Sequence, residues 1–158
     1  MSTLTVKEIA APVGYDLVMP AGHILQVVSM TWGGSTGGSS TSWFSAHGDY
    51  LLAITPSSTS SKILAHYSYS GYNNVSGCVH ATTLYRGSTN LSAETNGFAQ
   101  HKTGDGDTEH FKHSVTYLDS PATTSSITYQ PYLRSSDGNT IGISGDSDHT
   151  IILMEVAG

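Results

Sequence analysis

The sequence predicts an all-β fold, an antiparallel β-sandwich that is jelly-roll-like, with about eight strands and a short extended N-terminal arm. Charged residues make up only 11% of the 158 residues, against about 25% in an average soluble protein. Serine and threonine take their place, with 24 and 19 copies. These side chains compete with the helical backbone for hydrogen bonds, whereas threonine suits strands and serine suits turns. Short apolar-alternating runs with frequent turn signals between them are typical of a sandwich or jelly roll.

The chain is expected to contain an arm over residues 1–20 and one sandwich domain over residues 21–158, because its length favours a single domain. Pro12 and Gly14 interrupt the arm, and the turn at residues 20–22 ends it. No run of the sequence carries a sustained helical stripe of apolar residues.

The clearest strand is expected over residues 63–72, where Ile63, Ala65, Tyr67 and Tyr69 share one face and mostly polar residues share the other. The same pattern of alternating or β-branched residues, ended by turn signals, predicts the other strands. These are residues 23–32, 50–55, 75–86, 114–118, 127–133, 140–143 and 150–156.

Three segments between the strands are expected to be irregular. Residues 33–40 contain only Gly, Ser and Thr and are predicted to form a flexible loop. Residues 87–90 are a turn signal between two runs and suit a hairpin. Residues 97–109 are polar and contain glycines, which predicts a long loop.

Composition excludes several functions. The formal charge is −6 and the six basic residues are scattered, so no nucleic-acid partner is expected, because that needs clustered Lys and Arg. No stretch approaches the roughly 20 apolar residues that cross a bilayer, and the N-terminus lacks a signal-peptide core. We therefore expect no membrane partner and synthesis in a cytoplasm without export. Cys78 is the only cysteine and is predicted to be a small buried residue.

Several segments resemble a module of phage fibre-type proteins, particularly of aquatic phages and cyanophages. The resemblance runs from about Met19 to the end of the chain. It is carried by PAGHILQVV (20–28), ITPSSTSSKIL (54–64), LYRGSTNL (84–91), VTYLDSPATTSSITYQ (115–130) and IILMEVAG (151–158). It implies the β-sandwich found at the distal tip of tail fibres and tailspikes, a module that generally works as a trimer. These motifs have sequences typical of strands and turns and contain no catalytic signature, so they bear on the fold more than on activity.

Such fibres usually place an attachment domain and a shaft before the tip, whereas about twenty residues precede it here and the chain begins with Met. This departure favours a homotrimeric capsid decoration (cement) protein on the virion surface, assembled in the host cytoplasm, with the major capsid protein as its partner. The apolar side chains of the arm are the expected capsid contacts: Leu4, Val6, Ile9 and Val13. The alternative is a short tail-fibre or tailspike tip that binds host cell-surface polysaccharide.

Aromatic residues are the candidates for contact with a host surface glycan, because an exposed Trp or Tyr stacks its apolar face on a sugar ring. The predicted contacts are Trp43, Tyr50 and Tyr72. Core and trimer-interface positions are the competing interpretation of the same residues, since aromatics dominate both.

No catalytic residue, metal or cofactor is predicted. The chain has no G-x-S-x-G nucleophile elbow, and nothing nominates a pair of glycosidase carboxylates, so an enzyme is not expected. An acidic and histidine-rich segment is the one candidate cation site, but it lacks the full calcium-loop pattern. Its residues are His101, Asp105, Asp107, Glu109, His110 and His113.

Overall fold

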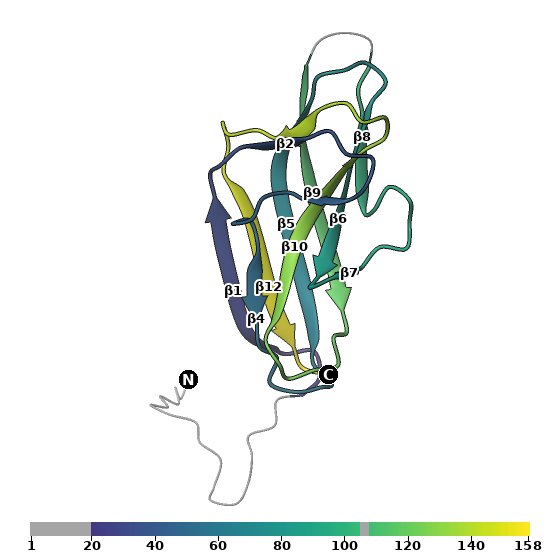
Figure 1. The fold of residues 1–158 in the computed structure, drawn as a ribbon. Helices are drawn as coiled ribbons and strands as arrows, with labels where there is room; N and C mark the ends of the chain where they lie inside the picture. The colour runs from purple at the N-terminus through teal and green to yellow at the C-terminus, as the bar shows by residue number, and fades with distance from the viewer. Residues whose placement is uncertain (1–19, 105–107) are drawn as a thin grey trace, which may run out of the picture.

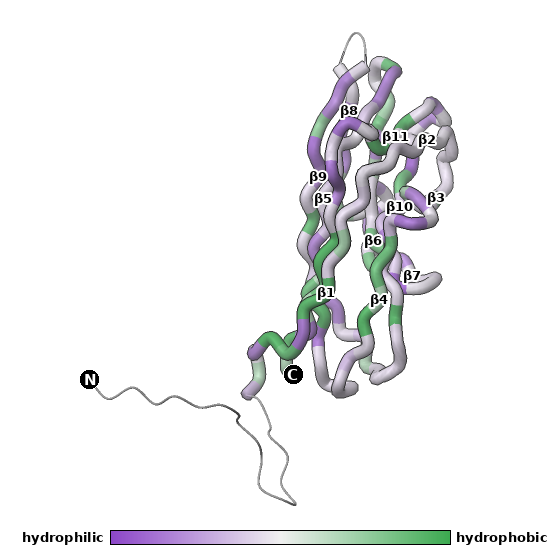
Figure 2. Tube along the Cα trace, turned by 90° about the vertical axis from the view of Figure 1, so that its left-hand side faces the viewer, coloured by the Kyte–Doolittle hydropathy of each residue, from purple (hydrophilic) through white to green (hydrophobic). Residues whose placement is uncertain are grey.

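A computed structural model describes residues 20–104 and 108–158. Two antiparallel sheets pack face to face as two layers, which Figure 2 shows from the side. The described residues contain no helix, and hence none long and apolar enough to cross a membrane. The strands within these residues are β1 (Ile24–Trp32), β2 (Thr36–Gly38), β3 (Phe44–Ser45), β4 (Leu52–Ile54), β5 (Lys62–Asn73), β6 (Val79–Arg86), β7 (Thr89–Asn90), β8 (Ala99–Lys102), β9 (Glu109–Asp119), β10 (Ile127–Ser135), β11 (Ile141–Ile143) and β12 (His149–Val156).

These twelve strands occupy eight positions, because four positions are each filled by two short strands in succession. In the first sheet, β11 and β12 pair end to end along one edge of β5, with β2 and β1 beyond them and β9 on the other edge of β5. In the second sheet, β4 and β3 pair along one edge of β10, β6 along the other, and β7 and β8 along the far edge of β6. Numbered by position, the sheets run 1-8-3-6 and 2-7-4-5, which is jelly-roll topology. The predicted fold class is therefore confirmed (Figure 1).

The core lies between the two sheets and is rich in tyrosine. Tyr67 and Tyr69 of β5 and Tyr129 of β10 are all at most 2% exposed. Their hydroxyls are satisfied by polar side chains from the facing sheet, as in the 3.2 Å contact between Tyr67 Oη and Thr82 Oγ1. Buried hydroxyls with partners in this way cost little and fix the two sheets in register. Cys78 is fully buried, as predicted.

An ion pair joins the two sheets at one end of the sandwich. Asp119 ends β9 in the first sheet, and its two carboxylate oxygens lie 2.8 and 2.9 Å from Arg86 Nη1 at the end of β6 in the second. Tyr129 of β10 donates its hydroxyl to the same carboxylate at 2.6 Å. The Asp119 side chain is only 6% exposed, so the carboxylate depends on these partners for its solvation.

Two predicted loops contain strands. The glycine-rich segment includes β2, whose Gly37 and Gly38 pack under aromatic rings: a Cβ on Gly37 would lie 2.6 Å from the hydroxyl of Tyr72, and one on Gly38 would lie 2.6 Å from the ring of Phe44. The polar segment over residues 97–109 includes β8, which pairs with β6. Both predictions were wrong because the sequences of these two strands show no alternation of apolar residues. The strands form because they pack and pair with neighbouring strands.

The two ends of the sandwich domain lie side by side. Ala157 accepts a hydrogen bond from Gly22 N and donates one to His23 O, both at 2.8 Å. The exposed side chains of Ile24 and Leu25 follow directly. The predicted capsid-contact residues Leu4, Val6, Ile9 and Val13 lie outside the described residues.

Candidate ligand-binding face on the second sheet

The outer surface of the second sheet carries a pair of stacked tyrosines. Strand β10 alternates buried residues such as Leu133 with half-buried, outward-facing ones at Gln130, Tyr132 and Arg134. Tyr85 of the neighbouring strand β6 stacks on Tyr132, with ring centroids 3.9 Å apart. Burial and the neighbouring Tyr132 raise the pKa of the Tyr85 hydroxyl, so it stays protonated near neutral pH and can both donate and accept a hydrogen bond.

Trp43 and two amide side chains gather around Arg134 on the same surface. The Arg134 guanidinium lies over the Trp43 ring, 5.3 Å from its centroid, which is a cation–π contact. Its Nη2 also donates to Asn96 Oδ1 at 2.6 Å, and Asn96 Nδ2 donates to Gln100 Oε1 at 2.5 Å. The guanidinium is thereby held between an aromatic plane and an amide, a geometry that Lys would not reproduce.

A tight turn brings Asn96 into this position. Gly97 N donates to Glu94 O at 3.0 Å to close the turn, and Phe98 N donates to Thr82 O at 2.8 Å to fix it on β6. Gly97 has a φ of +69°, and a Cβ there would lie 2.2 Å from the carbonyl oxygen of Thr82. Only glycine meets both requirements.

The same turn forms an open pocket. Residues 94–100 line a hollow of about 330 Å³, in the segment between β7 and β8 that projects from the side of the sandwich (Figure 1). We refer to the pocket and the surface beside it as the aromatic–amide face, made up of Trp43, Tyr85, Asn96, Gln100, Tyr132 and Arg134. Aromatic planes beside amide and guanidinium groups suit a sugar, whose C–H faces stack on rings and whose hydroxyls accept and donate hydrogen bonds.

The three predicted glycan contacts lie in three different environments. Trp43 is half-buried on the aromatic–amide face. Tyr72 is half-buried on the first sheet, 6.3 Å from the His110 ring, and so lies on the opposite side of the sandwich. Tyr50 does not agree with the expectation: it is fully buried, and its hydroxyl donates to the carbonyls of Ser68 and Thr150 at 3.0 and 2.9 Å. The ring is part of the core and offers no surface to a ligand.

The described residues of the acidic and histidine-rich segment do not converge on one point. Asp105 and Asp107 lie outside the described residues. His101 Nε2 lies 2.7 Å from Glu109 Oε2, and Gly104 N also donates to this carboxylate at 2.9 Å. The hydrogen bond from His101 is the main reason that the pKa of Glu109 is lowered. His110 is exposed on the other face of its strand, and within the described residues no group of three or more His, Cys, Asp or Glu is placed to hold a metal ion.

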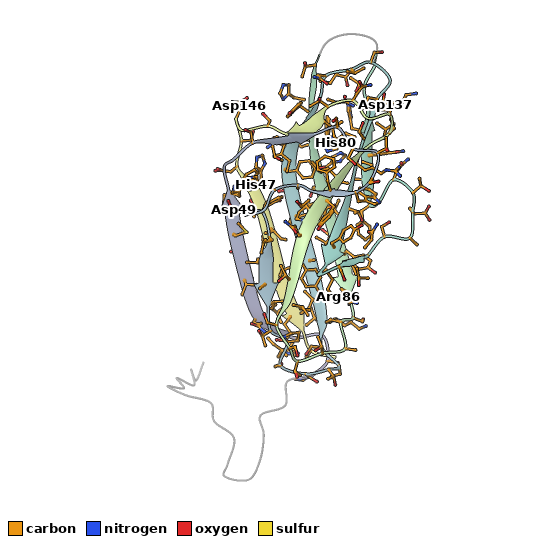
Figure 3. The ribbon with its side chains drawn as sticks, in the orientation of Figure 1. His47, Asp49, His80, Arg86, Asp137 and Asp146 are labelled. Atoms are coloured by element: carbon orange, nitrogen blue, oxygen red, sulfur yellow. The ribbon has the colours of Figure 1, made fainter. Side chains whose placement is uncertain are left out.

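Two histidines are buried between the sheets near that segment. His80 is fully buried, with Nε2 3.0 Å from the Tyr69 hydroxyl, and Figure 3 marks it inside the sandwich. His113 is 7% exposed, and its Nε2 has no hydrogen-bond partner in the described part of the chain. Burial lowers the pKa of His80 to about 3 and that of His113 to about 4. Both imidazoles are therefore neutral in the folded protein, packed around Phe111 at centroid distances of 4.9 Å.

Most of the aromatic–amide face was not predicted from the sequence. Tyr132 lies in the strand predicted over residues 127–133 and Arg134 follows directly after it, so their shared face could have been found by extending the alternation past residue 133. Asn96 and Gln100 gave no such signal, because they reach Arg134 only through strand pairing and the Gly97 turn.

No protein-family model matches the chain, and no curated protein matches it with significant similarity.

Proposed function

We propose that the protein is a structural component of a bacteriophage virion: a homotrimeric decoration protein, without enzymatic activity, that reinforces the outer surface of the head. The observation that carries this proposal concerns the end of the sandwich at which the domain begins, at Pro20. There Gly22 and His23 are hydrogen-bonded to Ala157, and Ile24 and Leu25 are 56% and 37% exposed. Clustered exposed apolar residues mark protein–protein contacts.

Two further properties support this assignment. A jelly roll is one of the folds used in viral capsids, and the sequence motifs of the sandwich resemble phage fibre-tip modules. Attachment by the apolar arm residues, which continue the chain from Pro20, seats this end of the sandwich on the major capsid protein. The opposite end, with β2 and β8, then projects from the head.

The test is binding to mature, undecorated capsids of the phage that encodes the chain. Three proteins are compared: the full chain, a version starting at Pro20, and a full-length version with Leu4, Val6, Ile9 and Val13 all changed to serine. The serine version is the matched control, because it keeps the length of the arm and removes only its apolar side chains. Near-stoichiometric binding by the full chain alone supports the proposal. Failure of the full chain to bind contradicts it.

The second candidate function is recognition of a host cell-surface polysaccharide, as in a short fibre or tailspike tip. The aromatic–amide face favours it, because stacked rings, two amides and a guanidinium lie together beside an open pocket of about 330 Å³. The sites do not compete for space: this face is on the second sheet, whereas Ile24 and Leu25 belong to the first.

A glycan array separates this candidate from a purely structural role. Trp43→Ala and Tyr132→Ala are expected to abolish binding to any glycan that the unmodified protein captures. Tyr72→Ala is the matched control, since it also removes a half-buried aromatic ring but from the opposite face. Binding that survives both substitutions, or that is lost only with Tyr72→Ala, contradicts the assignment of the face.

A further inference from the structure

The outer surface of the first sheet is apolar over half of its length. Strand register places four side chains in one row across the sheet, from β1 through β12 and β5 to β9: Val27, Met154, Leu64 and Leu118. Val27 and Leu118, at the two ends of the row, are 55% and 47% exposed. A sandwich sheet normally presents polar side chains outward, so this row departs from the pattern.

The rows on either side extend this surface without adding many charges. Below it, Ile24 lies opposite Val156 and Lys62. Above it come a row containing Ile152 and a row of hydroxyls, made up of Thr31, Thr150, Ser68 and Ser114. We call these four rows the first-sheet face. Figure 2 shows hydrophobic colouring along the part of β1 nearest the C-terminus.

One pair of polar side chains within the first-sheet face is already hydrogen-bonded. In the row of Ile152, His66 Nδ1 lies 2.9 Å from Thr116 Oγ1, so covering this row leaves fewer polar atoms without a partner. Lys62 stands at the lower border, and the other lysine on this side of the sheet, Lys112, lies beyond the hydroxyl row. The area between them carries no Asp, Glu, Lys or Arg on its outward positions.

The size of the face approaches that of a small interface between protein subunits. Four strands and four rows of outward side chains span about 19 by 27 Å, or roughly 500 Å² in flat projection. The largest apolar patch on a typical monomer is about 300–600 Å², and a standard interface buries about 800 Å² per partner. An apolar centre with a hydroxyl border also has the composition of an interface core and rim.

We propose that the first-sheet face is the contact between copies of this chain. A second copy is the occupant that the chemistry selects, because the surface lacks charges that need opposite charges on a different partner. Around a threefold axis, the Val27 edge of one copy meets the Leu118 edge of the next. Both strands at the edges of the first sheet, β1 and β9, belong to the face, so association also covers edges that are poorly protected by charge. The inference rests on the homo-oligomer of the proposed function and names its interface.

The test is the mass of the full chain in solution, by light scattering on a sizing column, for the unmodified protein and four variants. Val27→Lys and Leu118→Lys, alone and combined, place a charge at exposed positions of the face. Leu51→Lys is the matched control, since Leu51 is also an exposed leucine, at 36%, but lies outside the face. We expect an oligomer for the unmodified and Leu51→Lys proteins, and a folded monomer, by circular dichroism, for the double variant.

A second measurement uses the unmodified chain, so its result does not depend on whether a variant folds. Met154 lies in the apolar row and Met30 points to the core, so oxidative footprinting compares the two side chains in one sample. Met154 is expected to become protected as the protein is concentrated, while Met30 stays constant. An oligomer that persists in the double variant with Met154 unprotected overturns the interface and leaves the homo-oligomer standing. A monomer at all concentrations overturns both.

Discussion

Lowering the pH from 7 to 5 is expected to reduce the free energy of unfolding by about 4 kcal/mol, through His80 and His113. Both are buried and neutral in the folded protein, with pKa values of about 3 and about 4. In the unfolded chain a histidine has a pKa of about 6.5. At pH 5 the unfolded chain therefore binds two protons that the folded protein does not, and protonation favours unfolding.

The size and the pH window follow from these values. A histidine that titrates near pH 6.5 when unfolded and below pH 4 or so when folded loses about 2 kcal/mol of stability at pH 5, or about 1.4 kcal/mol for each pH unit below 6.5. The stability is complete above about pH 7, falls as the pH drops through 6.5, and levels off near the folded pKa values. The carboxylates of Glu155 and Asp137, whose pKa values are lowered to about 2, begin to lose their contribution only below about pH 5, as the pH approaches the pKa of an unfolded carboxyl group.

Urea unfolding at pH 7, 6 and 5, followed by circular dichroism, measures this loss. His113→Phe is the informative variant, because it fills the same space with a ring that cannot be protonated and His113 Nε2 has no partner to lose in the described part of the chain. It should remove about 2 kcal/mol of the loss between pH 7 and 5 and leave stability at pH 7 unchanged or higher. His66→Gln removes an imidazole from the surface of the first sheet as a matched control. A free energy of unfolding that is constant between pH 7 and 5 would refute the reasoning.

Three other substitutions test separate parts of the structure. Arg86→Ala leaves the buried Asp119 carboxylate without its ion pair and should lower the free energy of unfolding by about 3 kcal/mol, measured with urea at pH 7. A decrease below about 1 kcal/mol contradicts a stabilising role for this ion pair between the sheets. Gly97→Ala places a Cβ at a φ of +69° and too close to the Thr82 carbonyl oxygen. It should lower stability by about 2 kcal/mol, seen as a lower melting temperature. Trp43→Ala should weaken binding of a captured glycan at least about tenfold in titration calorimetry, or about 1.4 kcal/mol, with an unchanged melting temperature. An unchanged affinity removes Trp43 from the site.

The long strands could be predicted because their alternation is a direct record of burial. In β5, residues such as Ile63 and Tyr67 face the core while Leu64 and His66 face outward, and this period of two survives in the sequence. The short strands could not be predicted in the same way. β2 contains two glycines whose role is to leave room for Tyr72 and Phe44, and nothing local to β2 records the position of those rings.

The candidate site was predicted only in part, for a similar reason. Trp43 was a predicted contact from its residue type and its glycine-rich neighbourhood, but its partner Arg134 is 91 residues away in the chain. Residue type also failed to separate Trp43 from Tyr50, which is an equally good aromatic candidate in the sequence and a core residue in the structure. Burial of an individual aromatic depends on sheet packing, which alternation over a short, irregular segment does not encode.

The proposed role of this jelly roll is to cover the outside of a phage head. The decisive experiment is an electron cryomicroscopy reconstruction of virions from the source of the chain. We expect density for the sandwich on the outer head surface, with the end at Pro20 towards the shell and neighbouring copies in contact through Val27 and Leu118. Heads that carry no such density, in virions that contain the protein at the tail or not at all, would contradict it.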